Sequence, residues 1–499
     1  MGVSLKSRVA AGALIAILSG CAVGPDFERP KPPDGPVYPA GPQETVAAGG
    51  IGGNSQRFVS EMDIPGRWWS LFHSEKLNRL IDQALQANPN VVGAQAALKQ
   101  ARENLYAQQG QFFPTVTGNF SASRNKTANE VAPFLANNAL LYNLYTPQLS
   151  VTYVLDIWGA NRREVESLQA QADYQRFQLE ATYLTLAANV AVEAILEASL
   201  RGQIAATERL VALQHELTVR VEKQRAATLG TASELDLLAQ EAAEAQTAAT
   251  LPPLQKQLKQ TRDALTALLG RMPVEEPDET FLLTDLTLPQ DLPVSLPSKL
   301  VEQRPDIRSA EELMHAATAQ VGVAIAAMLP NISLSANIGT TATQASQLFQ
   351  PGNGFWSVAG SLDQTIFDAG ANLHKRRAAD AAMDQAAAQY KETVITAFQN
   401  VADGLHALRS DADALKASAD SERAAKKTFD LTSRQYALGT ISYVALLNAE
   451  QTYRQAELGL VQAQANRYAD TVGLFQALGG GWWNDPSEAL DERPGSAGR

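Results

Sequence analysis

The sequence is short of cysteine and of basic residues, and each shortage excludes a class of protein. Cys21 is the only cysteine among 499 residues, so the chain can form no internal disulfide and no cysteine-based metal cage. Acidic residues outnumber basic ones by 53 to 41, giving a net charge of −12, whereas nucleic-acid binding needs a basic face. No continuous apolar run long enough for a transmembrane helix follows Cys21, which excludes an ordinary helical membrane protein but not a β-barrel.

Catalytic signatures are also missing. The histidines are scattered and form no His-Glu-x-x-His pair: His73, His215, His315, His374 and His406. Glu311-Glu312 is expected near the start of a helix, where acidic side chains favour the helix dipole without acting as general acids. Gly352-Asn353-Gly354 lacks the lysine of a phosphate loop and is expected to be a loop at the foot of a strand. We therefore expect no enzymatic activity, no cofactor and no metal.

The N-terminus has the form of an export signal. Lys6 and Arg8 precede a short apolar stretch, residues 9–18, that is too short to remain as a membrane span. Leu-Ser-Gly-Cys, ending at Cys21, resembles the bacterial lipobox. The resemblance implies that residues 1–20 are removed and that Cys21 is acylated, which would tie the chain to a membrane. The alternative is an ordinary signal peptide with a chance cysteine.

A segment rich in proline and glycine follows. Ala22 stands where an aspartate would favour retention in the inner membrane, so the lipobox resemblance implies the outer membrane. Residues 21–55 have too few apolar side chains to build a core, and we expect them to form a lipidated, extended tether.

The rest of the chain is a duplication. Asn88-Pro89-Asn90 recurs as Arg304-Pro305-Asp306, and in each copy a second proline follows 25 residues later, at Pro114 and Pro330. Leu229-Gly230-Thr231 likewise recurs as Leu438-Gly439-Thr440. We expect two copies of one unit, residues 86–270 and 301–478.

Each copy begins with a helix and two strands. Residues 90–112 have a helical spacing of apolar residues. After Pro114 the apolar residues alternate with serine, threonine and asparagine, and the alternation returns over residues 148–157. The second copy repeats it over residues 332–338 and 356–362, so each copy supplies a hairpin of strands about ten residues long.

Two long helices then follow in each copy. Residues 161–225 and 372–437 contain no proline and are rich in alanine, leucine, glutamate and glutamine, which predicts helices of about 60 residues. Each ends at Leu-Gly-Thr, and return helices are expected over residues 232–270 and 441–478. Pro252-Pro253 predicts a kink or a local restart in the first of these.

The strands constrain the architecture. Their length and alternation are typical of outer-membrane β-strands, but four strands cannot close a barrel, and an open sheet edge is not tolerated in lipid. Several copies must therefore join, and three would give twelve strands. The alternative is a water-soluble α+β protein with half-buried strands.

Several motifs match one family. The run Cys21 to Pro30 (CAVGPDFERP), Trp68-Trp69-Ser70-Leu71-Phe72, residues 77–85 (LNRLIDQAL) and Leu478-Gly479-Gly480-Gly481-Trp482 resemble the outer-membrane efflux lipoproteins, the NodT/OprM-like branch of the TolC-like outer-membrane factors. The resemblance runs from Cys21 to about Trp483.

The resemblance implies a mainly α fold with a membrane β-barrel: a homotrimer with a twelve-stranded barrel and a long periplasmic α-helical tunnel. Residues 56–85 and the linker 271–300, with the C-terminal tail 479–499, would form an equatorial region. Such channels are the passive exit ducts of tripartite pumps and dock a periplasmic adaptor protein joined to an inner-membrane transporter of the RND class. The alternatives are an exit channel for an ABC-driven secretion system and a periplasmic spacer lipoprotein without a pore.

The resemblance also assigns sites. The Leu-Gly-Thr turns match the family's adaptor-docking tips, which here comprise Gly230, Thr231, Ser233, Leu235, Gly439, Thr440, Ser442 and Leu446. The glycines could instead only reverse the chain. Near the second tip, Asp430, Arg434 and Tyr436 are candidates for the closed periplasmic gate, although a run of charges on a helix is commonly just a solvated face.

Overall fold

The computed structural model describes residues 22–32, 41–128, 130, 140–226, 232–294 and 297–484. The chain divides into two compact units. The strand unit comprises Met1–Pro30, Ala97–Gln175 and Ser309–Tyr390, and the helical unit comprises Lys31–Ala96, Arg176–Arg308 and Lys391–Arg499. Helices α3 (Pro89–Gln109), α4 (Ala160–Ala226), α8 (Pro305–Ala326) and α9 (Ala371–Ala437) contribute residues to both units.

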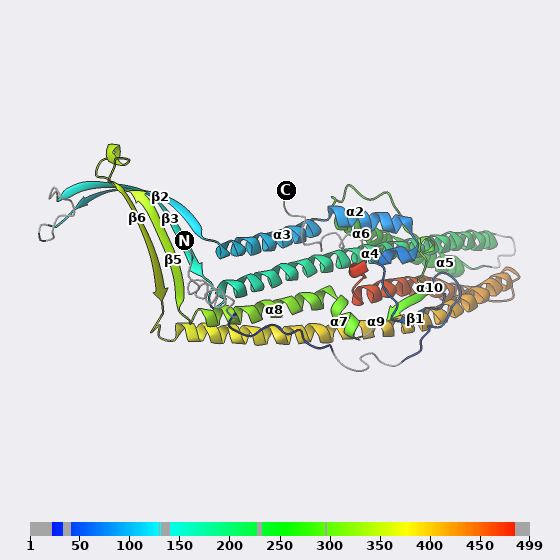
Figure 1. The fold of residues 1–499 in the computed structure, drawn as a ribbon. Helices are drawn as coiled ribbons and strands as arrows, with labels where there is room; N and C mark the ends of the chain where they lie inside the picture. The colour runs from blue at the N-terminus through cyan, green and yellow to red at the C-terminus, as the bar shows by residue number, and fades with distance from the viewer. Residues whose placement is uncertain are drawn as a thin grey trace. The chain divides into compact units, whose positions relative to one another are not determined.

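The strand unit is built around one antiparallel sheet. Its strands are β2 (Thr115–Lys126), β3 (Leu141–Leu155), β5 (Asn331–Thr340) and β6 (Gly354–Asp363), in the order β2-β3-β5-β6 (Figure 1). The central pair β3–β5 joins the hairpin of the first copy to the hairpin of the second. Short 3-10 turns, η2 (Gly110–Phe112) and η4 (Ala345–Gln347), precede β2 and β6. Within the described part of the chain, β2 and β6 each have one unpaired edge.

The predicted long helices are confirmed, as is the break in the first return arm. α4 and α9 have 67 residues each, and the second return helix, α10 (Tyr443–Ala477), is continuous. The first return arm is split into α5 (Glu234–Ala248) and α6 (Leu251–Leu268). Pro252 and Pro253 lie in the first turn of α6, where a missing amide N–H costs nothing, so the prolines restart the helix.

α4 contains the one described stretch that is long and apolar enough to cross a membrane by length and composition. In the helical unit its apolar side chains instead pack into the core, among them Leu186, Val190 and Ile195. Small alanines and scattered threonines give the helix this apolar composition, and the expectation that no continuous apolar run of this length follows Cys21 is not contradicted.

The core of the helical unit gathers segments from both ends of the chain. β1 (Arg57–Ser60) and β4 (Asp291–Val294) pair in parallel, and α2 (Glu75–Ala87) lies beside the turn η1 (Trp68–Phe72). η3 (Leu283–Asp285), α7 (Pro297–Gln303) and η5 (Trp482–Asn484) complete the elements. Trp68 stacks on Phe475 of α10 with ring centroids 5.5 Å apart. The segments expected to form the equatorial region therefore share one hydrophobic core.

Candidate functional site

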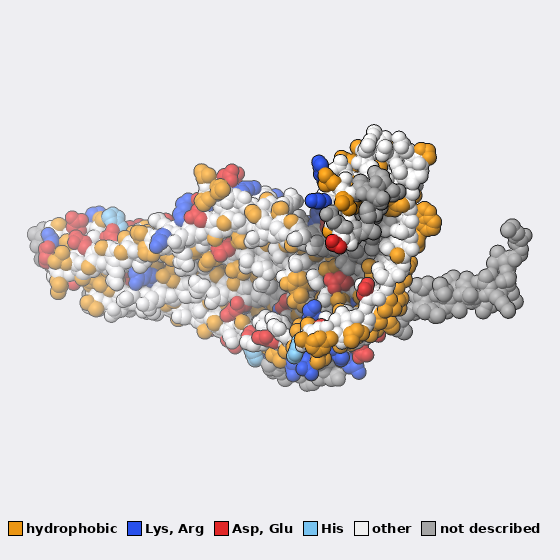
Figure 2. Space-filling view, turned by 90° about the vertical axis from the view of Figure 1, so that its left-hand side faces the viewer, with side chains coloured by type: hydrophobic (Ala, Val, Ile, Leu, Met, Phe, Trp, Pro, Cys, Tyr) orange, Lys and Arg blue, Asp and Glu red, His pale blue; other side chains and the backbone are white. Residues whose placement is uncertain are grey.

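The sheet has one apolar face and one polar face. One row across the four strands pairs Gly118, Leu149, Ile338 and Trp356, and the neighbouring apolar row pairs Val116, Val151, Ala336 and Val358. The residues between them form polar rows, such as Thr117, Ser150, Asn337 and Ser357. In Figure 2 hydrophobic side chains follow the outer edge of the arched strands. Such a sheet can contact lipid on one face and water on the other.

The apolar face has the height of a membrane. From Leu155 to Tyr145, β3 spans ten residue steps, which is about 33 Å along the strand and about 25 Å along the membrane normal at a strand tilt of about 40°. Its large side chains are exposed in the single chain, including Phe120, Ile338 and Trp356. A soluble protein rarely exposes an apolar patch of this size, so the water-soluble α+β alternative is not favoured.

The start of the expected tether is fastened to the helices of the strand unit. The amide N–H of Val23 donates to the carbonyl of Trp158. Gly24 packs closely on Gly322 of α8, since a Cβ added to Gly24 would lie only 2.4 Å from the Cα of Gly322. Cys21 lies outside the described residues, but its neighbour Ala22 contacts Gly159, in the short connection between β3 and α4. An acyl group on Cys21 would therefore start near the helix-proximal end of the strands.

Charged side chains complete this attachment. Asp26 accepts a hydrogen bond from Arg163 at 2.6 Å, and Arg29 donates to Glu311 at 2.6 Å. The expectation that Glu311 serves the helix dipole was wrong: it lies in the second turn of α8, is buried, and binds Arg29. Burial raises the pKa of Glu311 despite the opposing effect of Arg29.

His315 is the one histidine with a defined role in this attachment. Its ring stacks on Phe27 with centroids 4.4 Å apart, and its two nitrogens lie 3.4 Å from Glu312 and 3.1 Å from Glu166. The hydrogen bond with Glu312 raises the pKa of His315, with a further contribution from Glu166 and against the effect of burial. Among the described residues, no group of three or more His, Cys, Asp or Glu side chains is arranged to hold a metal ion.

The second predicted tip is a glycine-dependent helix end. Gly439 has a φ of 69°, and the amide N–H of Thr440 donates back to the carbonyl of Gln435. Ser442 then caps α10 by accepting from the amide of Ala445. A left-handed residue after a helix is the normal place for glycine, so the turn needs Gly439 for its conformation.

Only the part of the first predicted tip from residue 232 onward lies among the described residues. Gly230 and Thr231 lie outside the described residues. Ser233 caps α5 in a capping box with Asp236, and the hydrogen bonds from Ser233 lower the pKa of that carboxyl group. Leu235 is 76% exposed and is available to a partner.

Leu446, in contrast, is not available for docking. It is fully buried against Leu217 of α4 and Phe429 of α9. Two exposed apolar residues beside the second turn, Leu438 at 79% and Val444 at 61%, were not among the predicted docking residues. The helical spacing could have identified Val444, because residues two positions apart lie on nearly opposite faces of a helix. Val444 therefore points away from the buried Leu446.

The three gate candidates do not share one surface. Asp430 and Arg434 are both exposed on α9, four residues apart. Tyr436 is half-buried and donates a hydrogen bond to Gln224 of α4 at 3.2 Å, and its ring lies 5.8 Å from that of Tyr443. Tyr436 therefore fastens α9 to its own neighbours, which leaves Asp430 and Arg434 as the candidates that face outward.

Two acidic residues with raised pKa values, one in α9 and one in α10, were not anticipated. Burial raises the pKa of Glu450 in α10 to about 7, against the opposing effects of Gln214 of α4 and Arg454. Burial and the carboxyl group of Asp470 in α10 raise the pKa of Asp411 in α9 to about 7. Nothing in the sequence distinguishes these residues from the many other acidic residues on the helices.

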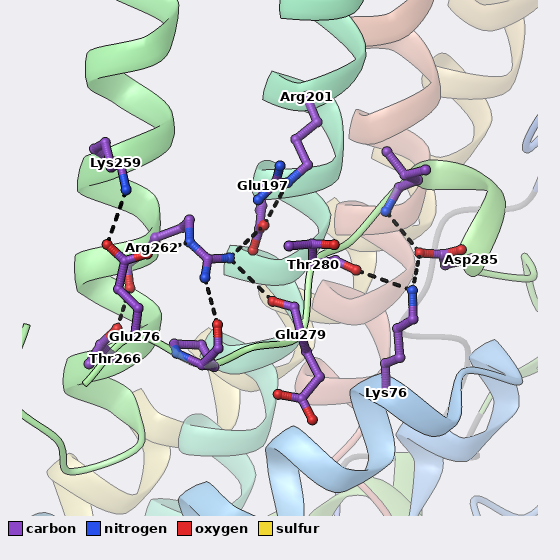
Figure 3. Close-up of polar contacts among 12 residues, drawn as sticks. Lys76, Glu197, Arg201, Lys259, Arg262, Thr266, Glu276, Glu279, Thr280 and Asp285 are labelled. Atoms are coloured by element: carbon purple, nitrogen blue, oxygen red, sulfur yellow. Dashed lines mark hydrogen bonds and ion pairs between the residues drawn. The ribbon is translucent and has the colours of Figure 1, made fainter. Parts of the chain in front are cut away.

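A buried arginine fastens the linker between the two copies to the first return arm (Figure 3). Arg262 of α6 donates to Glu197 of α4 at 3.0 Å and to Glu276 of the linker at 2.8 Å. It also donates to the carbonyls of Pro277 and Glu279. Arg201 provides a second cation for Glu197 at 2.7 Å.

A second buried arginine fastens the remainder of the tether to the second return arm. Arg467 of α10 is fully buried and donates to the side chains of Gln56 and Thr45 and to the carbonyls of Gly52 and Asn54. Residues 45–56 therefore contribute to the core of the helical unit, instead of forming a free tether.

Comparison with known proteins agrees with this arrangement. The family model described as "Outer membrane efflux protein" matches residues 80–271 and 296–480. The chain is 29% identical to the probable efflux pump outer membrane protein TtgC of Pseudomonas putida, covering 97% of each chain. It is 30% identical to the outer membrane protein OprJ of Pseudomonas aeruginosa, covering 94% of this chain and 95% of that one.

The fold comparison gives the same answer. The solved structure of the outer-membrane channel OprN superimposes with a TM-score of 0.82 at 29% identity, covering 93% of this chain and all of that one. At this coverage and TM-score the predicted TolC-like fold is confirmed. The chain belongs to the outer membrane efflux protein family.

Proposed function

We propose that three copies of this chain form the passive exit duct of a tripartite RND-type efflux pump in the outer membrane. The observation that carries the proposal is the four-stranded sheet with one apolar face, one polar face and two unpaired edges. Because an open edge is not tolerated in lipid, the free edge of β2 must pair with β6 of another copy. Three copies would close a twelve-stranded barrel around a lumen of serine, threonine and asparagine.

The proposed partners follow from two regions of the chain, the N-terminal segment and the two helix-pair turns. Acylation of Cys21 would add a lipid anchor, because Val23 and Gly24 are fastened beside the strand ends. At the helix-pair turns, Leu235 and Leu438 are exposed apolar residues that would contact a periplasmic adaptor protein, which in turn joins the inner-membrane transporter. Asp430 and Arg434 are the proposed gate residues. The duct itself would do no catalysis, and the pump would supply the energy.

The test is the mass of detergent-extracted protein, wild type against Cys21→Ala. We expect an acylated trimer from the wild type and an unacylated trimer from Cys21→Ala. A soluble monomer from both would contradict the barrel, and an unmodified wild-type chain would contradict the anchor.

Adaptor docking has a separate test. Leu438→Asp should abolish most drug resistance in cells while the trimer persists, because a charge would face an apolar contact. Met272→Asp is the matched control, since Met272 is 71% exposed in a loop of the helical unit far along the chain from either turn. Equal resistance in the two variants would contradict docking at this turn.

A further inference from the structure

Charge on the sheet is confined to its two ends. Among the residues of β2, β3, β5 and β6 only three are charged: Arg124, Lys126 and Asp363. Arg124 and Lys126 end β2 at the far edge of the sheet, and Asp363 ends β6 at the edge where the chain returns to α9. The sheet therefore has two cations at one end and one anion at the other.

The two cations belong to the apolar face. Side chains alternate along a strand, so Arg124 and Lys126 share a face with Val116 and Phe120. The cross-strand pairing agrees: Ala122 is opposite Tyr145, and the next position on this face places Arg124 opposite Asn143. The side chains of Ser123 and Asn125 point to the polar face instead. Arg124 thus follows directly after the row of Ala122 and Tyr145, and Lys126 lies in the next row opposite the exposed Leu141.

Their height corresponds to the lipid headgroups of the outer leaflet. The apolar rows cover about 25 Å along the membrane normal, which is the height of the hydrocarbon band of such barrels. Arg124 lies one row beyond that band, and Lys126 lies two rows beyond it. Both side chains are exposed, and none of the described residues forms an ion pair with either.

An apolar groove lies on the same face below the cations. It has a volume of about 820 Å³ and is lined by Gly118, Phe120, Leu149, Ile338, Phe349 and Trp356. Gly118 has no side chain, so the surface of the sheet is recessed between its neighbours. From Phe120 to Arg124 the distance along the strand is about 13 Å. One face of the sheet therefore carries an apolar groove that can hold acyl chains and, further along the strands, two cations that can bind phosphate. A phosphorylated lipid presents its acyl chains and its phosphate groups in the same order.

We propose that Arg124 and Lys126 bind the phosphate groups of lipopolysaccharide in the outer leaflet, with acyl chains of the same lipid in the groove at Gly118. A zwitterionic phospholipid offers one phosphate compensated by its own amine, whereas this glycolipid offers two uncompensated phosphates. Two cations two residues apart match the latter, and arginine is suited to bidentate binding of phosphate. The inference rests on the sheet spanning the outer membrane as proposed above.

The decisive variants move the charges without changing their number. Ser123→Arg with Arg124→Ser, and Asn125→Lys with Lys126→Asn, transfer each cation to the polar face at the same height. Native mass spectrometry of the detergent-solubilised trimer would measure binding of bisphosphorylated lipid A, its dephosphorylated form and phosphatidylethanolamine. The wild type should prefer the bisphosphorylated lipid, and each transfer should weaken that binding by about tenfold, the value of one charge-assisted hydrogen bond.

Conservative and control outcomes make the result unambiguous. Arg124→Lys should retain most of the binding, and Arg124→Gln should weaken it by about tenfold, as the transfer of the same charge does. Equal binding of bisphosphorylated lipid A by the wild type and the transferred-charge variants would overturn the lipid site while leaving the duct intact. A wild type that prefers phosphatidylethanolamine would overturn it as well. Absence of any trimer in the wild type would instead contradict the proposed function on which the site depends.

Discussion

The two copies of the duplicated unit secure their return helices in chemically different ways. In the first copy Arg262 lies eight residues before Gly270 and is held by two carboxylates. In the second copy Arg467 lies twelve residues before Gly479, one helical turn earlier, and is held by neutral oxygens. Nearby carboxylates raise the pKa of Arg262 against the effect of burial, and burial lowers the pKa of Arg467.

The difference shows how a duplicated helix pair acquires distinct attachments. Each arginine binds an extended segment, but Arg262 binds the linker that follows its own copy, and Arg467 binds residues 45–56, which precede the first copy. A buried guanidinium can be satisfied by ion pairs or by several carbonyl and amide oxygens, because it offers five donors. Replacing each arginine should therefore have a different cost and a different pH dependence.

The largest effect is expected for Arg467→Ala. The substitution leaves Gln56, Thr45 and two carbonyls without their donor, and we expect a loss of about 3 kcal/mol and release of residues 45–56. Thermal denaturation and limited proteolysis of the detergent-solubilised protein would measure both. Arg423→Ala is the control, because Arg423 pairs with Asp420 on the exposed surface of α9 and should change stability by less than about 0.5 kcal/mol. Unchanged proteolysis in Arg467→Ala would contradict the attachment.

Arg262→Ala should cost less, about 2 kcal/mol. Glu197 is fully buried, but Arg201 still pairs with it after the substitution. Adding Glu197→Gln should recover part of the loss, since a neutral amide is less costly to bury than a carboxylate. The same denaturation measurement applies, and a double variant that is less stable than Arg262→Ala would show that the ion pair is not what holds α6.

The smallest expected effect concerns Asp411 and depends on pH. Its folded-state pKa is raised to about 7 by burial and by Asp470, so the folded chain holds a proton between about pH 4 and pH 7 that the unfolded chain has lost. This contribution to stability is fully present below about pH 4 and is lost as the pH rises through 7. Asp411→Asn should stabilise the protein at pH 8 by about 1 kcal/mol. It should also reduce the pH dependence of the melting temperature between pH 5 and pH 8. A wild-type melting temperature that rises from pH 5 to pH 8, with the same profile in Asp411→Asn, would contradict the raised pKa of Asp411.

Local patterns were sufficient to predict the strands and the long helices. Alternation of Val116, Phe120 and Ala122 with serine and threonine fixed which side chains share a face, and the absence of proline over residues 161–225 indicated one helix. The same local rules identified the turn at Gly439 and an interruption at Pro252-Pro253, although they left open whether it would be a kink or a restart.

The attachments depend on contacts between residues far apart in the sequence. Arg29 and Glu311 are 282 positions apart, and Arg467 and Thr45 are 422 apart, so no spacing rule connects them. Leu446 was assigned to the docking surface by the family resemblance of the Leu-Gly-Thr turn, but the rotation of α10 directs it into the core. Its exposed neighbour Val444 shows that two residues along a helix change the face completely.

The central claim is that copies of this chain close a water-filled channel across the outer membrane. Single-channel conductance of the purified trimer in planar bilayers tests it directly. The account predicts stable ion conductance that rises when Asp430 and Arg434 are replaced by alanine, because charged gate residues would no longer narrow the lumen. A protein that inserts as a trimer and remains electrically silent in both forms would contradict the channel and favour a periplasmic spacer.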